Sequence, residues 1–268
     1  MLDKCVNNKI KDIQVESFCN KLILEIKENE NIIKALNEID RKYYDKLVNI
    51  KDFIKIIESY KDKKQENLNK NILCIYNGNP EITLKLCLEA VILKTNFILN
   101  IQDFMVGINK IIVELVNKVL KESNTEIFLF NLLTISEIKK LEEKVDKILC
   151  IGNTNEFIKL SQEGLYKLDF YPYKSLEIYC ENDELEELQK MIYDYSMLNQ
   201  YEVEVFVQDD IDNIIGQINE FGNGYCAVLL SKNEKHIKKF QEEVDSEIVC
   251  INENPYNKII FDIKKYCE

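Results

Sequence analysis

Residues 71–100 read NILCIYNGNPEITLKLCLEAVILKTNFILN, and this stretch decides the fold. It opens with the apolar run Asn71–Tyr76, which is typical of a buried strand. The pair Asn79-Pro80 then supplies the start signal of a helix over Glu81–Leu93, and Phe97–Leu99 indicates a second short strand. A strand, a helix and a strand in this order, with continuous apolar strands, indicate a parallel sheet that is covered on both faces.

The same alternation continues toward the C-terminus. It predicts an α/β protein with a doubly wound, mostly parallel sheet of about seven or eight strands. The further strands are expected over Glu126–Phe130, Lys147–Ile151, Ser175–Tyr179, Val203–Val207, Tyr225–Leu230 and Glu247–Ile251, and the further helices over Phe104–Leu120, Ile135–Glu143, Glu184–Leu198 and from Asn155 onward.

The N-terminal part lacks this alternation. Apolar residues recur there at helical spacing and the first glycine is Gly78, so we expect residues 1–68 to form a helical layer packed on the sheet. The α/β domain is then expected over residues 69–257. Residues 258–268 form a tail, in which Lys258–Tyr266 is expected to be a strand that pairs with another chain in an oligomer.

The composition narrows the class of protein. Of the 268 residues, 46% are hydrophobic, which is enough for a folded core. The net charge of −12 disfavours nucleic acid and anionic membranes as main partners, because both need clustered Lys and Arg. No apolar run is long enough to span a bilayer, and the first residues lack the apolar core of a secretory signal, so we expect a cytoplasmic protein.

The cysteines indicate buried thiols. There are 9 of them, an odd number, and no two have the C-x-x-C spacing of many metal and redox sites. Several lie inside apolar runs, where cysteine behaves as a small hydrophobic residue. His236 is the only histidine, so no histidine cluster for zinc is expected, and no metal is predicted.

The strand ends are where a ligand is expected, because parallel sheets bind ligands beyond their carboxyl ends. The strand Lys147–Ile151 runs into Gly152-Asn153-Thr154 and then into a helix. A glycine permits a close turn, and the N–H groups at the start of a helix bind phosphate, which predicts a dinucleotide pyrophosphate site. The alternative is an ordinary strand-to-helix turn capped by Thr154, and neither a G-x-G-x-x-G nor a P-loop lysine motif decides between the two.

Three segments together resemble the aldehyde dehydrogenase superfamily. Residues 144–157, KVDKILCIGNTNEF, are similar to the family's V-D-K-I-x-F-x-G-S-T-x-x-G segment. Residues 71–100 resemble the family's strand, Asn-x-Pro turn, helix and strand, with the acyl-CoA and acyl-phosphate reductases as the nearest branch, and residues 212–255 resemble its C-terminal segment. The matching residues are Val145, Asp146, Lys147, Ile148, Gly152 and Thr154, then Asn79, Pro80, Ala90 and Asn96, then Gly222, Gly224, Tyr225, Ala227, Ile248, Val249 and Asn252.

This resemblance implies the fold of the family's cofactor-binding half and a site for NAD or NADP. Two residues depart from the family's pattern. Phe157 stands at the last glycine of the segment, where its ring is expected to crowd the nicotinamide, and Asn100 or Ile101 stands where the family has a lysine that contacts the adenosine ribose. The residues that the resemblance places at the cofactor are Gly152, Asn153, Thr154, Asn79 and Asn96.

The resemblance also locates the family's catalytic positions. Asp169 falls near the general-base glutamate, and Glu202 falls at the nucleophilic cysteine. A carboxylate cannot form the thiohemiacetal from which hydride is transferred. Cys180 and Cys226 are the remaining candidate nucleophiles, and the alternative for both is a buried structural thiol.

Chain length gives a separate argument. In the family the catalytic domain lies between the cysteine segment and the C-terminal segment, whereas only residues 208–212 join these segments here. The resemblance, over residues 30–255, therefore implies a core without that domain. Three functions remain open: a non-catalytic binding or regulatory protein with a protein partner and a remnant nucleotide site, a minimal NAD(P)-dependent aldehyde or acyl reductase, and a structural subunit of an oligomer.

Overall fold

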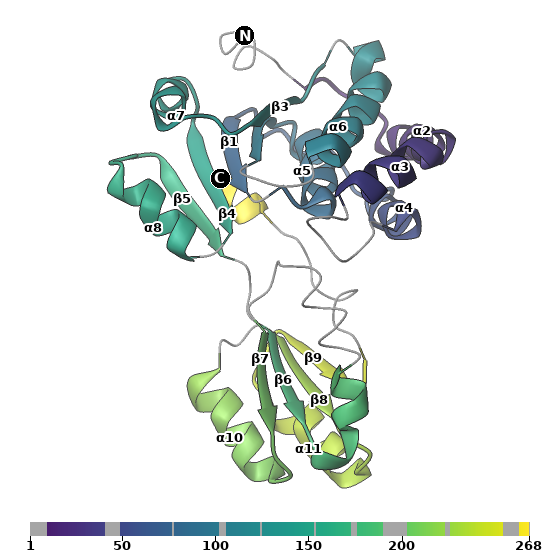
Figure 1. The fold of residues 1–268 in the computed structure, drawn as a ribbon, viewed down its shortest axis with the longest axis vertical. Helices are drawn as coiled ribbons and strands as arrows, with labels where there is room; N and C mark the ends of the chain where they lie inside the picture. Colours follow the sequence, from purple (N-terminus) through teal and green to yellow (C-terminus); the bar gives the residue numbers. More distant parts are fainter. Residues whose placement is uncertain are drawn as a thin grey trace. The chain divides into compact units, whose positions relative to one another are not determined.

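The computed structural model describes residues 10–40, 49–76, 78–101, 106–123, 125–152, 154–172, 176–189, 203–222, 226–253 and 263–267. The chain divides into two compact units, the first formed by Met1–Pro172 with Asp262–Glu268 and the second by Tyr173–Phe261 (Figure 1). The helical layer belongs to the first unit, and the α/β part is split between both units.

The first unit contains a five-stranded sheet in the order β3-β2-β1-β4-β5, in which every neighbouring pair is parallel. The chain runs outward from β1 to β2 and β3, and then crosses over to β4 and β5. This is the doubly wound arrangement that the sequence predicts. The strands are β1 (Asn71–Tyr76), β2 (Asn96–Ile101), β3 (Phe128–Asn131), β4 (Lys147–Gly152) and β5 (Leu168–Pro172).

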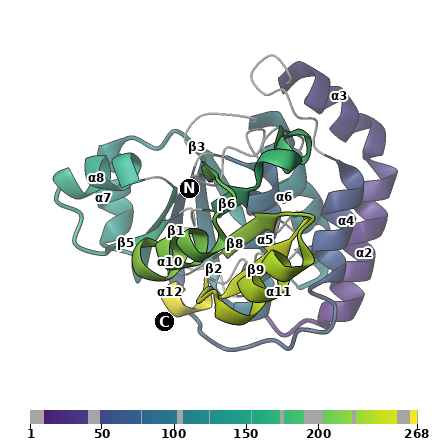
Figure 2. The same cartoon turned by 90° about the horizontal axis from the view of Figure 1, so that it is seen from below.

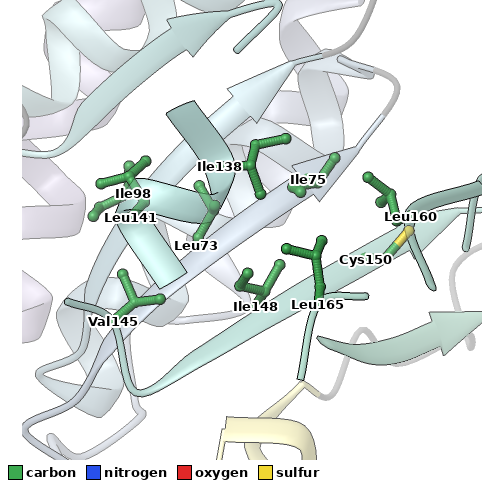
Figure 3. Close-up of a cluster of buried hydrophobic side chains, with 10 residues drawn as sticks. All are labelled: Leu73, Ile75, Ile98, Ile138, Leu141, Val145, Ile148, Cys150, Leu160 and Leu165. Atoms are coloured by element: carbon green, nitrogen blue, oxygen red, sulfur yellow. The ribbon is translucent and has the colours of Figure 1, made fainter. Parts of the chain in front are cut away.

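Helices cover both faces of this sheet. Figure 1 shows α7 and α8 on one side, and α5, α6 and the N-terminal helices on the other. The connecting helices are α5 (Pro80–Leu93), α6 (Val106–Leu120), α7 (Ile135–Glu142) and α8 (Thr154–Gln162). The face under α7 and α8 holds a core of ten buried side chains, which come from β1, β2, β4 and the two helices and their flanking turns (Figure 3).

The N-terminal helices form the expected outer layer. They are α2 (Val15–Glu28), α3 (Glu30–Asp40) and α4 (Ile50–Glu58), and Figure 2 shows α2 and α4 side by side. Helices α2 and α3 pack on α6, and α4 packs on α5. Because the sheet lies on its other side, α5 is buried along nearly its whole length. A helix that is apolar on all sides needs this sandwiched position.

The C-terminal residues return to the first unit. The short helix α12 (Lys264–Cys267) places the ring of Tyr266 against that of Tyr171 on β5, with centroids 5.0 Å apart. Lys147 on β4 donates a hydrogen bond to the carbonyl oxygen of Tyr266 at 2.6 Å. Residues 264–267 are thus helical and packed on their own chain where a strand for another chain was expected, and residues 258–262 lie outside the described part.

The second unit has its own four-stranded parallel sheet, in the order β7-β6-β8-β9. The strands are β6 (Leu176–Cys180), β7 (Val203–Val207), β8 (Cys226–Leu230) and β9 (Ile248–Ile251). The short 3-10 helix η2 (Asn182–Glu184) follows β6, the helix α10 (Ile211–Phe221) follows β7, and the helix α11 (Glu234–Glu243) follows β8. Helices α10 and α11 cover one face and share a buried cluster with it. The expectation of one sheet is therefore corrected to two sheets within the described residues.

Strand β5 is the element that the sequence analysis missed. Its sequence Leu-Asp-Phe-Tyr-Pro alternates in polarity and ends in proline, whereas the inner strands are continuous apolar runs. Alternation and proline are both typical of an edge strand, and β5 is the edge of the first sheet. The expected single strand over Ser175–Tyr179 corresponds to β6 in the other sheet.

Candidate functional site

The first sheet has its topological switch point between β1 and β4. These strands are hydrogen-bonded neighbours, with Tyr76 opposite Ile151 near their carboxyl ends. The chain leaves β1 into α5 on one face and leaves β4 into α8 on the other, so the two connections diverge at this point, which is where doubly wound sheets bind ligands. Asn79 follows β1 and Gly152 ends β4. The structure therefore brings two of the expected cofactor positions to the same sheet edge.

The turn after β4 begins a helix as expected. Gly152 is the last residue of β4, and α8 begins at Thr154. Asn153 lies outside the described residues. Because α8 starts at Thr154, its first N–H groups lie at the switch point, where they favour a bound anion.

The side chain of Asn79 is hydrogen-bonded to the helix that it starts. Its side-chain oxygen accepts hydrogen bonds from the backbone N–H groups of Glu81 at 2.8 Å and Ile82 at 3.2 Å, and Pro80 takes the first helical position. This is an N-cap, which stabilises a helix by about 1 kcal/mol. The observed role of Asn79 is therefore to shape the turn.

A buried cluster of polar side chains is hydrogen-bonded to this turn and to the start of α5. The side chain of Asn109 on α6 donates to the carbonyl oxygen of Gly78 and accepts from the hydroxyl of Thr83. The Tyr76 and Thr83 hydroxyls are hydrogen-bonded to each other at 2.7 Å. All three side chains are buried, and in the sequence they stand among apolar residues. A polar residue on the inner face of an amphipathic helix is the signal that the sequence analysis did not use.

Asn96 lies at the amino edge of the first sheet, opposite the edge of Asn79 and Gly152. It is the first residue of β2, and its side-chain nitrogen donates to the side chain of Asn71 at 2.8 Å. At about 3.3 Å per residue, the strand separates Asn96 from the carboxyl edge by roughly 16 Å. The observed role of Asn96 is therefore to link the amino ends of β1 and β2.

Asn100 is closer to the switch-point edge. It is buried on the face covered by α7, and its side-chain oxygen accepts the backbone N–H of Leu133 at 3.0 Å. That bond fixes which end of the amide is nitrogen. Its Nδ2 is buried and has no hydrogen-bond partner in the part of the chain that the structure describes. A buried donor of this kind is suited to an acceptor oxygen of a ligand or a water.

Phe157, which was expected to crowd the nicotinamide, packs within the first unit. Its ring stacks on that of Phe170 with centroids 4.7 Å apart, and it packs against the core cluster of Figure 3. The ring therefore fixes α8 to β5.

Asp169 lies away from the switch point. It pairs with Leu149 in the β4–β5 ladder, and its carboxylate is 3.4 Å from the ammonium of Lys147, near the amino end of β4. It also accepts the backbone N–H of Phe170 at 2.8 Å. Gly152 pairs further along with Pro172, about 10 Å from Asp169 by strand rise. The structure thus separates Asp169 from the expected cofactor turn.

The two candidate nucleophiles lie at opposite ends of the strands in the second sheet, one at a carboxyl end and one at an amino end. Cys180 is the last residue of β6 and Cys226 the first residue of β8. Both are buried, as are the other cysteines among the described residues. Burial, and then the carboxylates of Glu184, Glu181 and Asp209, raise the pKa of Cys180 to about 11. At neutral pH this residue is a thiol, and it donates to the carbonyl oxygen of Glu181 at 3.2 Å.

The second sheet has a switch point of its own, between the carboxyl ends of β6 and β8. Glu181 follows β6, and its carboxylate accepts the hydroxyl of Ser231 at 2.6 Å and is paired with Nδ1 of His236. The side chain of Asn252, after β9, bonds both the backbone N–H and the carbonyl of Ser231. These four residues join three strand ends and α11. Their separation along the chain conceals this cluster from sequence analysis.

Two negative findings limit the chemistry within the described residues. No group of three or more His, Cys, Asp or Glu side chains is arranged to hold a metal ion. No helix in the described ranges is both long and apolar enough to cross a bilayer.

The known structures that resemble this chain include aldehyde dehydrogenases. The chain matches an acetylating aldehyde dehydrogenase from Geobacillus thermoglucosidasius at 9% identity and a TM-score of 0.62, with 94% of this chain and 86% of that chain covered. A propionaldehyde dehydrogenase from the Clostridium phytofermentans fucose utilisation microcompartment matches at 11% identity, with a TM-score of 0.58 and the same coverages, 94% and 86%. Gamma-glutamyl phosphate reductase from Thermotoga maritima matches at 16% identity and a TM-score of 0.51, covering 95% of this chain and 86% of that chain.

These matches confirm the resemblance in fold that the sequence motifs indicate, including the acylating branch. No family model and no curated protein matches the chain. Since the alignments cover 94% or 95% of this chain, the likeness extends over both units. The chain therefore has the aldehyde dehydrogenase fold.

Proposed function

We propose that this chain is a non-catalytic binding or regulatory protein on an aldehyde dehydrogenase fold, which holds a nucleotide at the switch point of its first sheet. The observation that carries the proposal is the placement of the candidate catalytic groups. Asp169 pairs with Lys147 near the amino end of β4, Cys180 is a buried thiol, and Cys226 lies at the opposite edge from Cys180.

The thiol chemistry supports the non-catalytic part. Aldehyde oxidation through a thiohemiacetal needs a thiolate and an open path to it. A pKa of about 11 leaves Cys180 ionised in about one molecule in ten thousand at neutral pH. Reduced, buried cysteines also suit a reducing compartment such as the cytoplasm.

The turn geometry supports the nucleotide part. The start of α8 and the turn after β1 lie at the same sheet edge, and a helix start provides N–H donors and a favourable dipole for a phosphate. The orphan Nδ2 of Asn100, near the end of the adjacent strand β2, offers an additional donor. NAD or NADP is the expected ligand class. The nucleotide-bound protein would then bind a protein partner or a second copy of itself.

Thermal unfolding with NAD, NADP and AMP tests the nucleotide site. We expect the melting temperature to rise with ligand concentration, because a ligand that binds only the folded state stabilises it. Gly152→Val fills the turn and removes the shift. Asn96→Ala, at the opposite sheet edge, is the matched control and lowers the melting temperature without removing the ligand-induced rise. The absence of any shift in the original chain at millimolar nucleotide contradicts the site.

A reductase remains the second candidate, because Cys180 ends its strand directly beside the paired Glu181 and His236. Labelling with iodoacetamide, read residue by residue by mass spectrometry, separates the two functions. The non-catalytic proposal predicts uniformly slow labelling of the buried thiols in the folded protein. Fast, selective labelling of Cys180 that is lost in His236→Ala would support the reductase instead.

A further inference from the structure

A cavity of about 640 Å³ lies beside β3, apart from the switch point of the first sheet. Its wall includes every residue from Ile127 to Asn131. Successive side chains of a strand point to opposite faces, so a cavity that touches five consecutive residues must run along the strand's edge. Strand β3 is one of the two edge strands of the first sheet among the described residues, and β5 is the other.

The backbone of β3 presents hydrogen-bonding groups to this cavity. The N–H of Leu132 donates to Ile101 of β2 at 3.0 Å, so even-numbered residues of β3 direct their backbone groups inward. Ile127 points the other way, because its N–H and carbonyl bond the side chain of Asn117 at 2.7 and 2.8 Å. Leu129 has the same orientation as Ile127. Its N–H and carbonyl therefore face the cavity.

Helix α6 forms the opposite wall. The lining residues Val106, Lys110, Val113 and Asn117 recur at spacings of three and four, which places them on one helix face. A groove between an edge strand and a helix face is suited to an extended peptide, which adds to the sheet through its main chain. The side chain of Asn117 already makes the two hydrogen bonds to Ile127 that a neighbouring strand would make. An extended peptide would make the next pair of hydrogen bonds, to Leu129.

The charges at the groove indicate what kind of peptide fits. Two carboxylates, Glu114 and Glu126, line it against one ammonium, Lys110, which is 3.9 Å from Glu114. The whole chain carries a net charge of −12. Two copies docked through this groove would bring like charges together, which disfavours a second copy as the occupant.

We propose that the β3–α6 groove binds an extended peptide of alternating apolar and basic residues, which adds to the first sheet beside β3. The apolar side chains of the peptide, which all lie on one face of the added strand, pack on Val106 and Val113 of α6, while its basic side chains are within reach of Glu114 and Glu126. Its main chain pairs with the N–H and carbonyl of Leu129. This interaction surface is independent of the proposed nucleotide site.

Fluorescence anisotropy of a labelled peptide with the sequence KVKVKVK tests the groove on the full chain. We expect saturable binding that weakens with salt, and at least about a tenfold loss with Leu129→Pro, because proline removes the outward N–H. The fold tolerates this change, since the lost N–H is not part of the β2–β3 ladder. A peptide N-methylated at alternate residues tests the same contact without changing the protein and should also bind at least about tenfold more weakly.

A charge control distinguishes the groove from general attraction to an acidic protein. Glu114→Gln with Glu126→Gln should weaken binding several-fold, whereas Glu234→Gln with Glu242→Gln on α11 should not. Equal effects of the two pairs overturn the proposal, as does binding that N-methylation leaves unchanged. Displacement of the peptide by AMP would assign the cavity to the nucleotide, and a dimer of the free chain that Leu129→Pro dissociates would assign it to a second copy. Both outcomes contradict a peptide site.

Discussion

At the scale of single residues, close contacts decide which positions tolerate change. Gly222 ends α10, and a Cβ there would collide with the carbonyl oxygen of Ile218 and approach the carboxylate of Glu177. Gly216, within the same helix, has open space around the corresponding position. Gly222 is one of the glycines that carry the family resemblance, and its role here is close packing.

These two glycines form a matched pair. We expect Gly222→Ala to destabilise the protein by about 1–3 kcal/mol through the forced backbone shift. Gly216→Ala should stabilise it by about 0.5–1 kcal/mol, because alanine reduces the entropy of the unfolded chain and favours the helix. Urea unfolding followed by circular dichroism measures both. Equal effects of the two substitutions would show that the turn at Gly222 is not closely packed.

The buried Asn109 is expected to be a strong stabilising residue. Asn109→Ala leaves the carbonyl of Gly78 and the hydroxyl of Thr83 without this partner in a buried site, which should cost about 1–3 kcal/mol. Asn213→Ala, which removes an exposed hydrogen bond to Gln208, is the control and should change the free energy of unfolding by less than about 0.5 kcal/mol. If the two variants unfold at the same denaturant concentration, the polar cluster does not stabilise the turn.

A pH dependence follows from Asp209. Hydrogen bonds from the backbone and side chain of Asn182 lower the pKa of its carboxyl from the ordinary value of 3.8. A lowered pKa in the folded state adds stability above the unfolded value, and that stability is lost as the pH falls through the folded value. Asn182→Ala should therefore flatten the fall of the melting temperature below about pH 4. Identical acid profiles of the two proteins would contradict this.

At the scale of elements, the sequence predicts most strands to within one or two residues. β1 and the edge strand β7 have the predicted bounds, and β4 differs by one residue, because their apolar residues recur in strand patterns. β5 was missed because an aspartate interrupts it and it ends in proline. The strand pattern also cannot show that β6 begins a new sheet, because a run of apolar residues does not specify its neighbours.

For the candidate site, the sequence predicted the positions of residues that follow a strand but not the side-chain contacts. Gly152 and Asn79 follow their strands, so topology places them at one edge without side-chain detail. Asn96 is the first residue of β2, so the same rule places it at the amino edge of the sheet, away from Asn79 and Gly152. The pairing of Glu181 with His236, across 55 positions, has no local signal in the sequence.

The C-terminal helix α12 gives a prediction at this scale. Deleting residues 263–268 removes the contacts of Tyr266 with Tyr171 and Lys147, so the amides of β4 and β5 should exchange with deuterium faster. The amides of β6 to β9 should be unaffected, and size-exclusion chromatography should show the same oligomeric state as the full chain. A change of oligomeric state would restore the idea that the tail pairs with another chain.

At the scale of the whole molecule, two parallel sheets with separate switch points share one chain of the aldehyde dehydrogenase fold. Fold does not determine function, which depends on the groups at the sites. At the first switch point the described groups are donors suited to an anion. At the second they form a bonded cluster of Glu181, Ser231, His236 and Asn252 beside a buried thiol. This difference supports binding rather than turnover.

The most direct test of this account is the absorbance of NADH while the purified chain is incubated with saturating NAD and an aldehyde, with and without coenzyme A. The account predicts no formation of NADH above the rate without protein, under conditions in which NAD raises the melting temperature. Steady formation of NADH that is abolished by Cys180→Ser would contradict it and establish an enzyme.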